Sequence, residues 1–120
     1  MGKFKSPMPH CIVEYSADLK AHLDIQQVLH QLFVLLEKSA EFDSAAIKLR
    51  AQPYSDVFSG LADHSFMHIR LHILSGRSPQ QKLALTSAIV NGLSAQLAMV
   101  KSLSAEVVDI QRESYTKRLT

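Results

Sequence analysis

The chain has 120 residues, of which 47 % are hydrophobic, so it is long and apolar enough for one folded domain. A formal net charge of +2 is too small to argue for nucleic acid or an anionic membrane surface as a partner. The single cysteine, Cys11, excludes an internal disulfide and fits a reducing, cytoplasmic setting. No stretch is apolar enough to span a bilayer. Residues 1–8 lack an apolar core and are expected to be a disordered extension or tag, with a single domain over residues 9–120.

The first third of the chain predicts a strand followed by a helix. Residues 10–15 alternate as in a strand with one buried face. Residues 16–23 are interpreted as a polar connection. Asp24 then has the position of a helix N-cap, with Gln27 in the capping-box position three residues later. Apolar residues follow at helical spacing to about Lys38, which predicts a helix with one buried face.

Two further strands are predicted in the middle of the chain. Apolar and charged side chains alternate over residues 47–52, and Pro53 is expected to end this second strand. After a loop, residues 65–74 alternate most regularly and predict the third strand. The polar side of the third strand carries His68, Arg70 and His72. This side is too polar for a second core, so it meets either solvent or another copy of the chain.

A junction between strand and helix is predicted at Gly76-Arg77-Ser78-Pro79. Ser78 has the N-cap position, a proline follows at the first helical position, and Gln81 completes a capping box. Apolar spacing continues this second helix towards Val100, and residues 104–111 alternate as a fourth strand.

The order of these elements predicts an α+β fold. Two β-α-β units form a four-stranded mixed sheet, with both helices on one face to bury their apolar sides. The same order fits the ferredoxin-like folds, which host many unrelated functions. RNA recognition by such a sheet uses aromatic residues on the middle strands, and on the third strand only Phe66 qualifies.

Four residues are candidates for a functional site. If translation began at Met8 and that methionine were removed, Pro9 would carry a free secondary amine, which can accept a proton. Burial beside positive charges would lower its pKa from about 8 towards neutrality, where a general base works best. Arg77 precedes a helix N-terminus, and together they can hold a carboxylate or phosphate, although the arginine by itself is better interpreted as a surface residue at a turn. Lys48 and Arg50 lie on the polar side of the second strand, where they are either solvated or anion contacts.

A metal site is the alternative suggested by three histidines at intervals of four residues, His64, His68 and His72. On a strand, this spacing separates successive side chains by about 13 Å. No cysteine cluster or His-Glu-x-x-His motif accompanies them. Histidines that form hydrogen bonds or lie at an interface are the favoured interpretation.

Three motifs together resemble the tautomerase superfamily, and most of all its 5-carboxymethyl-2-hydroxymuconate delta-isomerases. They are Pro9-His-x-Ile-Val-Glu14, Ile47-Lys-x-Arg50, and Phe66-x-His68 leading to Gly76-Arg77-Ser78. The resemblance covers nearly all of residues 9–112. It implies a trimer with active sites between subunits, a reaction that moves a double bond in 5-carboxymethyl-2-hydroxymuconate during homoprotocatechuate breakdown, and no metal or organic cofactor.

The resemblance also implies roles for individual residues. Pro9 is expected to shuttle a proton as both base and acid, Arg77 to bind a substrate carboxylate, and Lys48 or Arg50 to make a second anion contact. Lys48 departs from the arginine of the family pattern, and a lysine cannot form the planar two-point pair with a carboxylate. Pro9 is an amide while residues 1–8 remain, so this form of the chain is expected to be inactive. The alternatives are a non-enzymatic trimer that kept the fold and a ferredoxin-like small-molecule-binding module.

Overall fold

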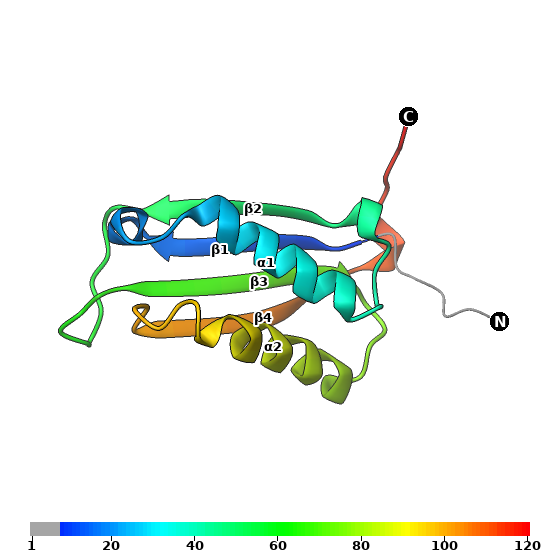
Figure 1. Cartoon of the computed structure of the whole chain (residues 1–120). Helices are drawn as coiled ribbons and strands as arrows, with labels where there is room; N and C mark the ends of the chain where they lie inside the picture. The colour runs from blue at the N-terminus through cyan, green and yellow to red at the C-terminus, as the bar shows by residue number, and fades with distance from the viewer. Residues whose placement is uncertain (1–7) are drawn as a thin grey trace.

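The computed structural model describes residues 8–120, which form one four-stranded sheet and two α-helices (Figure 1). The strands are β1 (His10–Ser16), β2 (Lys48–Tyr54), β3 (Phe66–Leu74) and β4 (Ser102–Ile110). The helices are α1 (Ile25–Lys38) and α2 (Pro79–Ser94), and the short 3-10 helices are η1 (Ala17–Ala21), η2 (Ser44–Ala46) and η3 (Arg112–Ser114). The sheet order is β2-β1-β3-β4. β1 is parallel to β2 and antiparallel to β3, which is parallel to β4, so the predicted mixed sheet of two β-α-β units is confirmed.

Both helices lie over the same face of the sheet, as Figure 1 shows, and the core fills the space between them. The alternation in β1 and β3 produces this core, because every second side chain points to the helices. These strand residues are Cys11, Val13, Tyr15, Met67, Ile69, Leu71 and Ile73, and all are buried. Across residues 8–120, no helix is long and apolar enough to cross a membrane.

The predicted helix starts are confirmed, although the details of the caps differ. Asp24 caps α1 by accepting a hydrogen bond from the N–H of Gln26 at 3.1 Å, rather than through a capping box with Gln27. Ser78 and Gln81 form the full capping box of α2. These bonds satisfy backbone N–H groups that a helix start leaves without partners.

Three sequence predictions need correction. The second helix ends at Ser94 and not near Val100, because the apolar residues that follow are buried from a turn rather than from the helix. Pro53 lies inside β2, which is tolerated because β2 is an edge strand and one ladder donor can be missing there. The connection after β1 is not purely polar, since Leu19 in η1 is 1 % exposed and belongs to the core.

The opposite face of the sheet carries no helix among residues 8–120 and is called the open face below. Register places its polar side chains in rows across the strands: His10 of β1 pairs with Lys48 of β2 and His72 of β3, and Arg50 and Arg70 flank the next row. The predicted polar face is therefore confirmed. It presents histidines and cations near the start of β1, at the end of the sheet where α2 also begins (Figure 1).

Candidate active site

Pro9 lies at the start of β1 and is buried. Its carbonyl oxygen accepts a hydrogen bond from the backbone N–H of Lys48 at 3.1 Å, so the first residue of β2 is fixed beside it. Met8, which was predicted to belong to a disordered extension, is only 1 % exposed, and residues 1–7 of that predicted extension lie outside the described residues. In this chain the Pro9 nitrogen is therefore an amide within a buried Met8–Pro9 peptide, and an amide nitrogen cannot accept a proton.

Arg50 lies on the open face and contacts His10, the residue that follows Pro9. Its Nη1 lies 3.2 Å from Nδ1 of His10. Burial lowers the pKa of His10, and the charges of Arg50 and Lys48 lower it further. The ring is consequently neutral at pH 7, so Nδ1 can accept the hydrogen bond from the guanidinium. Of the predicted cations, Lys48 and Arg50 are thus brought together at the Pro9 end of the sheet.

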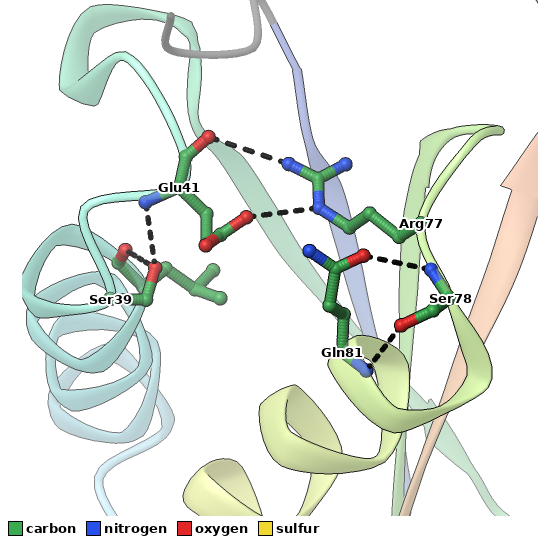
Figure 2. A network of polar contacts seen from close by, with 6 residues as sticks. Ser39, Glu41, Arg77, Ser78 and Gln81 are labelled. Carbon is green, nitrogen blue, oxygen red and sulfur yellow. Dashed lines mark hydrogen bonds and ion pairs between the residues drawn. The ribbon is translucent and has the colours of Figure 1, made fainter. Parts of the chain in front are cut away.

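Arg77 lies in the turn between β3 and α2, at the same end of the sheet, but its side chain is already engaged (Figure 2). Its Nε donates to Oε1 of Glu41 at 3.1 Å, and its Nη2 donates to the Glu41 carbonyl oxygen at 3.5 Å. The guanidinium carbon also lies 5.2 Å from the centre of the Phe42 ring. Glu41 was not among the predicted site residues, since no local sequence pattern links it to an arginine 36 residues later.

Two polar networks cover the middle of the open face. Glu14 accepts hydrogen bonds from Tyr54 at 2.6 Å and from Arg70 at 3.2 Å. His68 contacts Oγ of Ser104 at 2.7 Å and Oε2 of Glu106 at 2.5 Å. Strand alternation placed Glu14, His68 and Arg70 on the polar face, but their pairing depends on strand register, which was not predicted.

The three histidines at intervals of four residues lie in different surroundings. His64 accepts from the backbone N–H of Ser59 at 2.9 Å, while His68 belongs to the network with Glu106. The pKa of His72 is lowered by burial and by Arg70. Within residues 8–120, no group of three or more histidine, cysteine or acidic side chains is arranged to hold a metal ion.

Cys11 is completely buried under the helices, on the face opposite to the cations. Burial raises the pKa of its thiol to about 12, which leaves it protonated and unreactive at neutral pH. Cys11 is therefore a small core residue rather than a redox group.

The mixed sheet of two β-α-β units, with both helices on one face, defines a tautomerase-type fold, and solved structures of this class resemble it. Residues 9–118 match the family of 5-carboxymethyl-2-hydroxymuconate isomerases, and the chain belongs to this family. A 5-carboxymethyl-2-hydroxymuconate isomerase from Deinococcus radiodurans R1 superposes with a TM-score of 0.76 at 26 % identity, covering 98 % of this chain and 92 % of that one.

Two more distant structures share the fold. A 5-carboxymethyl-2-hydroxymuconate delta-isomerase has a TM-score of 0.77 at 19 % identity, covering 94 % of this chain and 89 % of that one. A fused 4-OT, described as a symmetric trimer, has a TM-score of 0.69 at 18 % identity, covering 91 % of this chain and 93 % of that one. No curated protein matches the chain in sequence.

Proposed function

We propose that this protein is an isomerase that moves a double bond in an unsaturated 2-hydroxy or 2-oxo di- or tricarboxylate by proton transfer through the amine of Pro9. Membership of the 5-carboxymethyl-2-hydroxymuconate isomerase family is the observation that carries this proposal. The match begins at Pro9 itself, the residue whose nitrogen would become a free amine once residues 1–8 are removed. 5-Carboxymethyl-2-hydroxymuconate, or a closely related acid, is the proposed substrate.

Proton transfer between two carbons needs one group that is first a base and then an acid. Removal of a proton beside a carbonyl leaves a dienolate, whose negative charge must be stabilised by nearby cations. Arg50, which contacts His10, and Lys48, whose backbone N–H bonds the Pro9 carbonyl and whose Nζ donates to the Ala46 carbonyl at 3.4 Å, are the candidates. The same positive charges would lower the pKa of the Pro9 ammonium and make the amine a competent base at neutral pH.

Arg77 is proposed as the group that binds a substrate carboxylate. Its side chain is 14 % exposed and lies in the turn that leads into α2. Lys48 can supply charge to a second carboxylate but not a planar two-point contact. We therefore propose that Arg77 orients one carboxylate, while Lys48 or Arg50 contributes a second, less directional contact.

A homotrimer is proposed to cover the open face of the sheet, as in the fused 4-OT trimer of similar fold. Two nitrogen atoms support this assembly: Nε of Arg70 and Nε2 of His72 are shielded from solvent yet have no hydrogen-bond partner within residues 8–120. A buried polar group without a partner costs stability, and a neighbouring copy can provide hydrogen-bond partners. Sedimentation equilibrium is expected to give three times the chain mass.

The alternative is a non-enzymatic trimer that kept the fold. It is favoured by one specific observation, namely that Met8 is buried and makes Pro9 an amide in this chain. Under this alternative, residues 1–8 remain attached in the cell, and the cationic end of the sheet binds a carboxylate without converting it.

A comparison of three proteins separates the two functions. Conversion of an unsaturated 2-hydroxy diacid is followed by its ultraviolet absorbance for residues 9–120, for residues 1–120, and for residues 9–120 carrying Arg77→Ala. Only the first is expected to turn over rapidly. Residues 1–120 lack the free general base, which contributes about 10²–10⁴-fold, and the Arg77→Ala variant lacks the group that orients the substrate carboxylate. Equal rates for residues 9–120 and for intact residues 1–120, with the leader verified by mass, would eliminate the Pro9 amine as the base.

A further inference from the structure

Glu41 holds Arg77 along one edge of its guanidinium (Figure 2). The carboxylate accepts from Nε and the Glu41 backbone carbonyl accepts from Nη2, so both contacts lie on the Nε side. The Phe42 ring lies 5.2 Å from the guanidinium carbon. The glutamate and the arginine side chains are 23 % and 14 % exposed, which limits competition from water.

Both partners are fixed by their own elements. The backbone N–H of Glu41 donates to Oγ of Ser39 at 3.3 Å, and that hydroxyl donates to the Leu36 carbonyl at the end of α1 at 2.6 Å. On the other side, the capping box of Ser78 and Gln81 fixes the turn that carries Arg77. The guanidinium is therefore held between two rigid helix ends, which is the arrangement that orients a binding group well.

The contacts with Glu41 determine which donors of Arg77 remain for a ligand. A guanidinium has five N–H donors, and Glu41 uses the one at Nε and one at Nη2. The two N–H donors of Nη1 and the second N–H donor of Nη2 point away from Glu41, at the end of the guanidinium. A carboxylate can pair with these two nitrogens in the planar, two-point geometry that arginine favours.

We infer that Glu41 is a positioning residue, which fixes Arg77 so that it binds the substrate carboxylate end-on through Nη1 and Nη2. This inference rests on the proposed function, in which Arg77 binds a carboxylate. The Glu41–Arg77 ion pair has no net charge, so it attracts a distant anion only weakly. Its contribution to binding therefore comes from directional hydrogen bonds at short range. Attraction of the substrate anion is then left mainly to Lys48 and Arg50.

A kinetic experiment tests the positioning role in the protein that begins at Pro9. Glu41→Gln is expected to raise KM about 10-fold and to change kcat less than threefold, because a displaced binding group weakens orientation. Glu37→Gln is the matched control: Glu37 accepts from Ser44 at 2.9 Å and is not among the partners of Arg77 within residues 8–120, so KM should stay within twofold. In the Arg77→Ala background, Glu41→Gln should leave kcat/KM unchanged within twofold.

Two kinetic results would overturn the inference: an unchanged KM in Glu41→Gln, or the same loss of kcat/KM with and without Arg77. A second readout does not depend on turnover. In the NMR spectrum of residues 1–120, the Nε–H signal of Arg77 should be protected from exchange and should lose that protection in Glu41→Gln. If residues 9–120 are inactive while the Nε–H of Arg77 is protected, the proposed function is rejected but the contact is kept. If residues 9–120 are active while the Nε–H is unprotected, the contact alone is rejected.

Discussion

Gly76 is expected to be the glycine whose replacement by alanine costs the most stability through the backbone. Its φ is +127°, a conformation that L side chains rarely adopt, and it directly precedes Arg77. An added Cβ would lie 3.7 Å from Nη2 and 3.8 Å from Nε of Arg112, which is ordinary contact. The cost of Gly76→Ala is therefore backbone strain and not a clash.

Backbone strain of this kind costs about 1–2 kcal/mol, which raises the unfolding equilibrium constant about 5- to 30-fold. With a urea dependence near 2 kcal/mol per molar, the unfolding midpoint should fall by about 0.5–1 M. The assay is urea unfolding followed by circular dichroism, at one fixed protein concentration because assembly contributes to stability.

Gly60→Ala is the matched control for this measurement. Gly60 has no atom within 4 Å of an added Cβ, and it is not among the residues with positive φ. Its replacement should leave the midpoint unchanged or raise it slightly, since alanine restricts the unfolded chain. Equal midpoints for Gly76→Ala and Gly60→Ala would refute the strain argument.

Two further predictions concern stability. Ala40, just after α1, has a φ of 60°, so Ala40→Gly should raise the free energy of unfolding by about 0.5–1 kcal/mol. Ala95 at the end of α2 has a helical conformation, so Ala95→Gly should lower the free energy of unfolding. Changes of the same sign for both variants in urea unfolding would contradict this. Burial and nearby cations lower the pKa of His10 and of His72, so the unfolded chain takes up protons first as the pH falls below about 6.5. Unfolding measured between pH 7 and pH 5 should therefore show a loss of stability that is smaller in a His10→Gln, His72→Gln double variant; an equal or larger loss in that variant would contradict the assignment.

Element order was predictable from the sequence because it depends on local patterns. Strand alternation, the N-cap at Asp24 and the capping box at Ser78 each arise from residues within one turn or one strand. The end of α2 was misjudged because Leu97 and Val100 continue the apolar spacing although they pack from a turn. Pro53 was read as a strand end because its tolerance depends on β2 being at the sheet edge.

The candidate site was predictable only residue by residue. The family motifs named Pro9, Lys48, Arg50 and Arg77, and the hydrogen bond between Pro9 and Lys48 places two of them in one spot. The ion pair of Arg77 with Glu41 joins segments 36 residues apart through the tertiary fold. No sequence period encodes such a contact.

Covalent labelling of the Pro9 nitrogen shows whether a free amine at this residue carries the proton. An acetylenic 2-oxo acid accepts addition of a free amine across its triple bond, and mass spectrometry of the digested protein locates the added mass. Cys11 should not compete, because it is buried and its pKa is raised to about 12. Proton transfer through the Pro9 amine predicts one label on Pro9, with parallel loss of activity, in the protein that begins at Pro9, and none on Pro9 in residues 1–120. Loss of activity without a label on Pro9 would contradict it.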